Sequence, residues 1–500
     1  MSYPADLSHQ SPSDSQVRQH RANNRMAWLA IGGYAAIITL PLIAGLGGPL
    51  VPVFPAASLA LGLFLYYRAP ELYVGYVWWM MFLCNVIRRL IDYRAGYLTF
   101  GPWGLTANLV ASISLITAVQ QLPSSHRKGA LPFVFPLCSL AYAFCIGINE
   151  NAPNALVNST LAWLCPVAFG FHIFVNWRQY PQLKQIFLKA FLWGVLVMGI
   201  YGIIQYAVAP PWEVFWLENS EIDSFGSPEP FGIRVSSTAG APQSFATLML
   251  AGLILVFCEA TNPVSYLASG FGYIAFILTF ARAVWLSAAI SIPLFLLSLK
   301  PSYQIRMIVV GVVLFAIVAT TLLSWEPVYE KFYERFESFF DIQGDTSFND
   351  RSAGYEVLWG VALVQFIGKG LGFSTESISS SIGANDGSVF PLIFNFGWFG
   401  LAAYLGGFLL MLSKLLQIPD ARSDIFIGAC RMVVLCVLVQ AGLNSVFDSS
   451  SGIVMWGFLS IGLAGHKYYL AQKRLARDAL AVPSPPQAPP EPGLRGMPWG

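Results

Sequence analysis

The feature that most constrains this chain is a series of apolar stretches long enough to cross a lipid bilayer. Backbone exposed to lipid must satisfy its hydrogen bonds within the segment, so each stretch is expected to be a helix. Only 11% of the 500 residues are charged, against about 25% in soluble proteins. The stretches lie at about 27–46, 50–67, 72–87, 104–120, 131–148, 156–176, 187–208, 237–258, 264–280, 284–299, 306–325, 390–412, 424–442 and 451–465. The sequence therefore predicts an all-α polytopic integral membrane protein with roughly 12–14 transmembrane helices.

Basic residues favour one orientation in the membrane. Arg18, Arg21 and Arg25 precede the first apolar stretch, which by the positive-inside rule places the N-terminus in the cytoplasm. Alternate loops then carry basic residues on that same side: Arg68, His126, Arg127, Lys128, Arg178, Lys184, Lys300, Arg306, Lys414 and Arg422. The segment after the last stretch is also basic, so we expect both termini to be cytoplasmic.

This topology divides the chain into five regions. A cytoplasmic segment (1–25) precedes the predicted helices of 26–325, and a large outer loop (326–389) precedes the last three (390–466). The tail (467–500) is cytoplasmic, and its proline-rich end is expected to be disordered. Aromatic residues at helical spacing between 329 and 340 predict either an amphipathic helix on the outer membrane face or a packed helix of a small outer domain.

Arginines on the predicted outer side are the candidate functional groups. Arg282 lies between two apolar runs that contain no other charge, where a charge is costly unless it sits at a surface or in a polar cavity. A guanidinium group binds phosphate through paired hydrogen bonds and keeps its proton. The other outer arginines are Arg88, Arg89 and Arg94 in a short loop, Arg234 at the end of the loop 210–234, and Arg351 in the large loop. They predict a site for a phosphorylated substrate, or alternatively a set of interfacial anchors and local ion pairs.

Five segments resemble, in order, motifs of the O-antigen ligase and polymerase superfamily. The first, RVSSTAGAPQSFA from Arg234, resembles an arginine followed by a PN-x-x-A helix start, with Gln243 in place of Asn. The second, FILTFARAVWL around Arg282, is similar to T-x-S-R with Ala281 in place of Ser. The others are DTSFNDR (Asp345 to Arg351), GKGLGF (368–373) and the stretch from Asp386 to Gly397. The resemblance covers residues 190–415 well, and the rest only by the number of helices.

The resemblance implies a metal-independent glycosyltransferase of GT-C-like architecture that uses no cofactor. Its substrate would be an oligosaccharide on a polyprenyl pyrophosphate carrier, at the periplasmic face of a bacterial inner membrane. Partners would be membrane lipid and a chain-length regulator of a polysaccharide export system, with no nucleic acid involved. Fixed positive groups are needed for the charge that develops on the leaving diphosphate. Arg282 and Arg351 are the catalytic candidates for this role, with Arg234, Arg88, Arg89 and Asp345 as substrate-binding candidates.

The acceptor hydroxyl must lose a proton, so a positioned base is also expected. Asp386 is the first candidate and Asp345 the second. Their alternatives are a helix N-cap for Asp386 and a cap or an ion pair with Arg351 for Asp345. Ligases of the superfamily usually have histidine where this chain has Asp386, and none of its five histidines falls in a predicted outer loop. This favours a polymerase of lipid-linked repeat units that make exopolysaccharide, O-antigen or capsule.

Three alternatives remain open. The first is a ligase that transfers a finished glycan to lipid A core or another acceptor. The second is a transporter of lipid-linked sugars, although the predicted spans carry almost no charge in their middles. The third is a scaffold for a synthase complex, which would leave the outer arginines unexplained.

Overall fold

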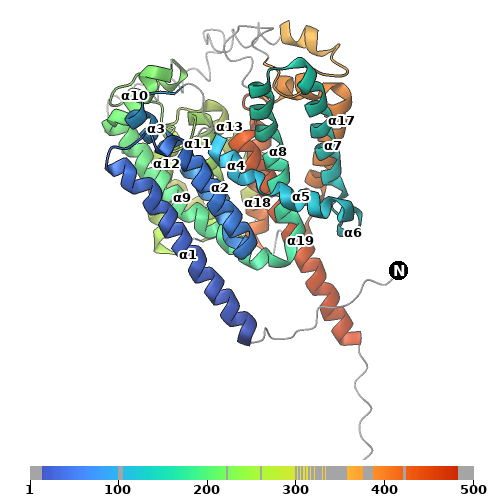
Figure 1. Ribbon diagram of the computed structural model, residues 1–500. Helices are drawn as coiled ribbons and strands as arrows, with labels where there is room; N and C mark the ends of the chain where they lie inside the picture. The colour runs from blue at the N-terminus through green and yellow to red at the C-terminus, as the bar shows by residue number, and fades with distance from the viewer. Residues whose placement is uncertain are drawn as a thin grey trace, which may run out of the picture.

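The computed structural model of the protein describes residues 14–98, 105–220, 223–259, 262–298, 357–374, 387–419 and 424–481, with scattered helical positions between 301 and 333. The described residues fold as helices, and their β-type pairing is limited to one isolated bridge between Gly226 and Ile233. Figure 1 shows a bundle of long helices with short helices at its edges. The prediction of an all-α protein is confirmed.

Eight helices among the described residues are long and apolar enough to cross a membrane, so the chain has the features of a multi-pass membrane protein. They are α1 (Asp14–Ile43), α2 (Leu50–Arg68), α3 (Pro70–Ala95), α7 (Leu131–Glu150), α8 (Pro153–Val175), α9 (Tyr180–Val208), α17 (Val389–Leu416) and α18 (Ile425–Val439), which a 3-10 turn extends to Gly442. Shorter apolar helices are α11 (Pro242–Cys258), α12 (Pro263–Ile277) and α13 (Arg282–Ser298), and the chain's last described helix is α19 (Ser449–Ala481).

The centre of the bundle is packed with aromatic side chains. The Trp78 ring on α3 lies 4.8 Å from that of Phe191 and 5.2 Å from that of Phe187, both on α9, and 5.8 Å from that of Phe458 on α19. Large apolar side chains on the bundle's outside are exposed, as expected of surfaces that face lipid, and Leu40 on α1 is 65% exposed.

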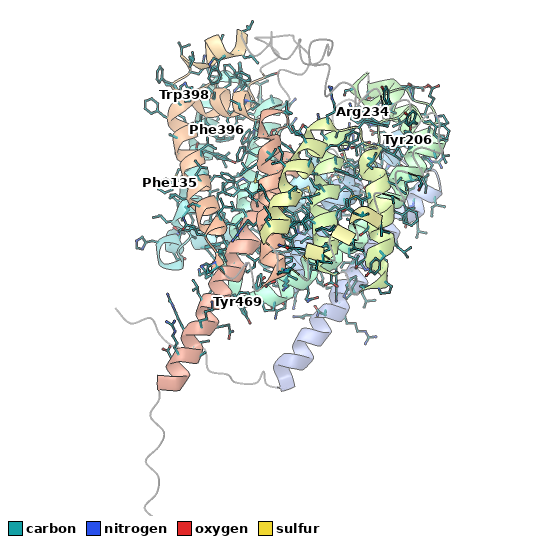
Figure 2. All side chains as sticks on the ribbon, turned by 180° about the vertical axis from the view of Figure 1, so that it is seen from behind. Phe135, Tyr206, Arg234, Phe396, Trp398 and Tyr469 are labelled. Atoms are coloured by element: carbon teal, nitrogen blue, oxygen red, sulfur yellow. The ribbon has the colours of Figure 1, made fainter. Side chains whose placement is uncertain are left out.

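The two ends of the described chain lie at the same end of the bundle. The first turn of α1 and the last turn of α19 both extend from the lower end in Figure 1. Figure 2 shows Tyr469 of α19 toward this end and Arg234 at the opposite, upper end. The arrangement agrees with termini on one side of a membrane, and the upper end then corresponds to the predicted outer face.

Two expectations from the sequence are wrong. The stretch expected to span at about 104–120 is not one helix: its described residues form two short helices, α4 (Thr106–Ser112) and α5 (Leu115–Gln121). At the break, the Ser112 and Ser114 hydroxyls donate hydrogen bonds to carbonyls three residues earlier, which competes with regular helix.

The second error concerns the loop assigned to Arg88, Arg89 and Arg94. All three lie within α3, which continues to Ala95. Arg88 pairs with Asp92 one turn later (Nε–Oδ2 3.4 Å), and Arg89 is buried in a salt bridge described below. These partners allow the helix to continue through residues whose charges suggested a loop.

Candidate functional site

A polar cavity of about 610 Å³ lies in the upper half of the bundle. It forms where the upper half of α3 meets the first turns of α4, α8, α11, α17 and α19. Its polar lining consists of Asn85, Asn108, Asn158, Ser159, Ser244, Ser374, Asn395, Asp448, Ser449 and Ser450. Carboxamide and hydroxyl groups dominate this list, and they both donate and accept hydrogen bonds. Trp163 and Phe373 add aromatic surface.

Three of the motif-like segments reach this cavity. Gly240 and Ser244 belong to the segment that begins at Arg234, Phe373 is the last residue of GKGLGF, and Ser374 follows it. Asn395 belongs to the segment that leads from Asp386 into α17. Segments that are up to about 150 residues apart in the sequence therefore line one space.

Asn395 is the cavity's most buried carboxamide. Its side chain is on α17 and the residue is only 5% exposed, and its Oδ1 accepts no hydrogen bond from the residues that the structure describes. A buried acceptor of this kind needs a partner, which water or a bound molecule can supply. Asn395 is thus positioned to accept a hydrogen bond from a hydroxyl in the cavity.

Asp448 brings a carboxylate to the cavity wall, just before α19 begins. The Ser445 hydroxyl donates a 2.6 Å hydrogen bond to its Oδ1. Burial raises the pKa of Asp448 above the ordinary carboxyl value, although the hydrogen bond from Ser445 acts in the opposite direction. A carboxylate with a raised pKa is better matched to accept a proton near neutral pH.

The loop that carries Asp448 is fixed by buried polar contacts. The Gln440 side chain accepts hydrogen bonds from Thr247 on α11 (2.9 Å) and Asn444 (3.0 Å). The buried Ser388 hydroxyl donates to the Asn444 carbonyl and accepts from the Val446 amide, both at 2.8 Å. These contacts hold the loop against the beginning of α17, next to the cavity.

Arg234 connects two motif-like segments directly. Its guanidinium donates hydrogen bonds to the carbonyls of Thr279 (3.4 Å) and Phe280 (3.3 Å), and its Nη1 donates to Ser224 O (2.7 Å). Arg282 begins α13 two residues after Phe280, so the segments carrying both arginines lie together at the upper end. Phe280 has a φ of 49°, a strained conformation for a residue with a side chain, and such strain is often found at functional sites.

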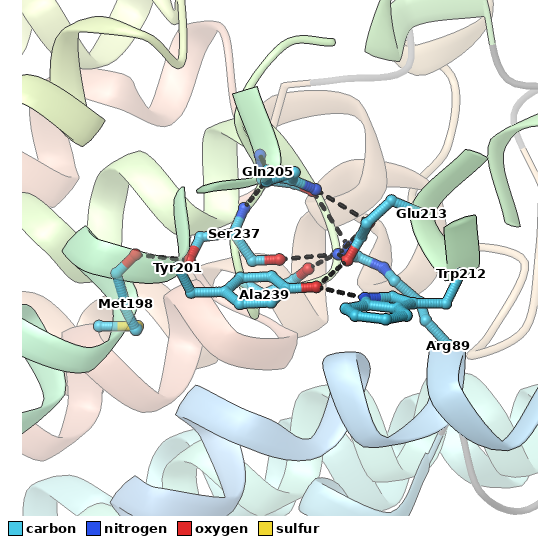
Figure 3. Close-up of polar contacts among 9 residues, drawn as sticks. Arg89, Met198, Tyr201, Gln205, Trp212, Glu213, Ser237 and Ala239 are labelled. Atoms are coloured by element: carbon cyan, nitrogen blue, oxygen red, sulfur yellow. Dashed lines mark hydrogen bonds and ion pairs between the residues drawn. The ribbon is translucent and has the colours of Figure 1, made fainter. Parts of the chain in front are cut away.

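Arg89 is buried in a hydrogen-bond network that holds the loop 236–239, which follows Arg234 (Figure 3). Its Nη1 lies 3.0 and 2.9 Å from the two carboxylate oxygens of Glu213, on the short helix α10 (Pro211–Ser220). Nη1 also donates to the carbonyl of Ser237 (2.7 Å), and Nη2 donates to the carbonyl of Ala239 (2.6 Å). Both charged side chains are 1% exposed, so Arg89 positions the loop 236–239 between Arg234 and the cavity.

Gln205 completes this network from α9. Its Nε2 donates to Glu213 Oε2 at 2.9 Å, and its Oε1 accepts from the backbone amides of Ser236 (3.1 Å) and Ser237 (2.7 Å). Arg89 on α3 and Gln205 on α9 thereby hold the backbone of this loop from two helices, just before Gly240 and Ser244 reach the cavity.

The GKGLGF turn packs against neighbouring backbone. Gly370 has a φ of 76°, and a Cβ there would overlap the amide nitrogen of Gly147 on α7. Asn151 fixes the turn by donating to the carbonyls of Lys369 (2.8 Å) and Leu371 (3.0 Å). Glycine is required here for the close approach, and the turn then delivers Phe373 and Ser374 to the cavity.

The remaining predicted site residues are placed as follows. Arg88 is 22% exposed and paired with Asp92 on α3. Asp345, Arg351 and Asp386 lie outside the described residues, together with most of the predicted large loop, and stay predictions.

Sequence reasoning missed the asparagines and Asp448. A signal was present, because Asn85, Asn108, Asn158 and Asn395 each occur within or beside apolar runs. An unpaired carboxamide is costly in such a run and therefore indicates a polar cavity or a hydrogen-bonded neighbour.

Fold and cavity together define the class: a multi-pass, all-helical membrane protein with a polar cavity near one end of its bundle. Comparisons with protein-family models, curated proteins and solved structures found no match.

Proposed function

We propose that this protein is a metal-independent membrane glycosyltransferase that polymerises polyprenyl-pyrophosphate-linked oligosaccharide repeat units at the periplasmic face of a bacterial inner membrane. The observation that carries the proposal is the composition of the cavity wall, in which asparagines and serines surround a carboxylate. Such groups match the hydroxyls of a saccharide, and Trp163 and Phe373 offer apolar faces to its rings. The five motif resemblances are the second line of support.

In the proposed reaction, the acceptor hydroxyl attacks the anomeric carbon of the donor sugar. A glycosidic C–O bond forms as the C–O bond to the diphosphate breaks, and polyprenyl diphosphate leaves. Arg282, at the N-terminus of α13, and Arg351 are assigned to the charge that develops on the leaving group, where a helix N-terminus and a guanidinium both favour an anion. Arg234 holds the carbonyls that precede Arg282 and so positions it.

The hydroxyl's proton passes to a carboxylate. Asp448 lines the cavity and has a raised pKa, which supports it as the base, beside the sequence-based candidate Asp386. Arg89, proposed from sequence as a substrate-binding residue, is given a positioning role because its guanidinium is occupied by Glu213 and the loop carbonyls.

The test is a reconstituted assay with purified protein and the host's polyprenyl-pyrophosphate repeat unit, read as product size. We expect a ladder of lipid-linked oligomers that is lost in Arg282→Ala. Comparing Asp448→Asn with Asp386→Asn then identifies the base. Matched controls are Arg474→Ala and Asp478→Asn. They change the same residue types near the C-terminal end of α19, whereas Asp448 lies just before its N-terminal end.

Transfer only when a separate acceptor is supplied would make the protein a ligase. No transfer under either condition would reject a glycosyltransferase and leave the transport of lipid-linked sugars to be tested. Loss of activity in the α19 controls as well would mean that the variants report damage to the fold.

A further inference from the structure

A second cavity, of about 440 Å³, lies at the opposite end of the bundle from the polar cavity. It forms between the beginning of α7 and the later parts of α8, α17 and α19. Lys414, His466 and Lys467 line it, together with apolar side chains that include Phe133, Phe174 and Leu463. The loops at this end carry the basic residues that predict the cytoplasmic side.

The charge of this cavity is of one sign. Two lysines from different helices converge on it, and no aspartate or glutamate is found among its described lining residues. The Lys467 ammonium lies 5.0 Å from the Phe174 ring centroid and 5.3 Å from that of Trp177, and these cation–π contacts orient its side chain. The His466 imidazole adds a hydrogen-bonding group. A cavity with these walls favours an anion.

The surface beside the cavity is apolar and faces outward. Leu131 and Phe135 on α7 are 45% and 43% exposed, and Leu410 on α17 is 49% exposed. The backbones of these helices are in close contact here, since a Cβ on Gly407 would lie 2.5 Å from the Pro132 carbonyl oxygen. A molecule with its charged group in the cavity could therefore place a hydrocarbon chain along α7 and α17, in the region occupied by lipid.

We infer that this cavity binds the phosphate headgroup of an anionic phospholipid from the cytoplasmic leaflet. The lysines pair with the phosphate, and the acyl chains lie against the exposed apolar side chains of α7 and α17. Phosphate from solution would match the lysines equally well, but it would leave the apolar walls unused. This inference is independent of the proposed function at the upper end.

The experiment measures binding to the full-length protein in a neutral detergent. The probes are a short-chain phosphatidylglycerol, phosphatidylcholine of the same chain length, and inorganic phosphate. A lysine near an anionic lipid surface contributes about a fivefold change in affinity. We expect tight binding of phosphatidylglycerol only, weakened about fivefold by Lys414→Gln and roughly 25-fold by Lys414→Gln with Lys467→Gln.

Lys473→Gln is the matched control, because it removes the same charge from an exposed position six residues after Lys467 on α19. It should bind phosphatidylglycerol like the wild type. Because Lys414 is exposed, its single variant tests the site without disturbing packing. Equal binding of phosphatidylcholine, equal binding of inorganic phosphate, or equal weakening by Lys473→Gln would each overturn the inference.

Discussion

The guanidinium of Arg234 donates a hydrogen bond of 3.3 Å to the carbonyl oxygen of Phe280, 46 residues later in the chain. Phe280 is two residues before Arg282, so one candidate arginine holds the backbone that leads to the other. This relationship makes the shape of the Arg234 side chain as important as its charge.

Arg234→Lys should lower transfer activity although it keeps the positive charge. A lysine ammonium is a point charge and cannot reproduce the planar fork that reaches the carbonyls of Ser224, Thr279 and Phe280. Hydrogen bonds from a charged donor contribute about 1.5–3 kcal/mol each, so we also expect a lower midpoint of thermal unfolding. Activity at the wild-type level in Arg234→Lys would show that only the charge matters.

Breaking the salt bridge between Arg89 and Glu213 should be strongly destabilising. Removing one partner leaves a buried, unpaired charge, and we expect Arg89→Met or Glu213→Leu to cost about 3–5 kcal/mol. The double variant should cost much less than the sum of the two, as measured by unfolding in detergent. Arg94→Ala is the control, since this arginine is exposed near the end of the same helix. Additive losses would mean that the two side chains act independently.

The activity should depend on pH through Asp448. A base must be ionised, so the rate should fall as the pH drops through the raised pKa of Asp448. Ser445→Ala removes a hydrogen bond that lowers this pKa, and it should therefore move the acid limb of the pH–rate profile to higher pH. Asp448→Asn should reduce the maximal rate by about 10²–10⁴-fold. A profile that does not move in Ser445→Ala would argue against Asp448 as the base.

Gly370→Ala should destabilise the protein by about 2–4 kcal/mol, because the new methyl group would meet the backbone of Gly147 and the residue has a positive φ. The matched control is Gly360→Ala. Gly360 is helical and has open space around it, so alanine there should be neutral or slightly stabilising. The midpoint of thermal unfolding distinguishes the two. Equal midpoints would show that the GKGLGF turn can move away from α7.

The sequence predicts the helical, multi-pass character because long apolar runs leave the backbone no alternative in lipid. It is less informative where contacts between side chains from distant segments determine whether a helix continues or ends. Arg89 looked like a loop residue because its partner Glu213 is 124 positions away. The short helices α4 and α5 also replace a predicted span, since serine hydroxyls compete for the backbone between them.

The sequence pointed to arginines at the predicted outer end, and the structure brings the Arg234 and Arg282 segments together, although neither arginine is among the described lining residues of the polar cavity. Its cavity could not be predicted in the same way, because carboxamides such as Asn85 and Asn395 stand alone in their own helices and form a group only after folding. Asp448 was missed for a related reason. Its significance depends on the contacts of Gln440 and Ser388 that fix its loop.

The salt bridge between Arg89 and Glu213 also has a consequence for how the chain is synthesised. Arg89 leaves the ribosome 124 residues before Glu213, which at 5–20 residues per second is a delay of about 6–25 s. Throughout that interval the guanidinium lacks Glu213 and the loop carbonyls that surround it in the folded protein, so we expect it to stay hydrated at the membrane surface. The upper end of α3 can therefore reach its final place only after α10 has been made, so the insertion of the first third of the protein is completed by its middle third.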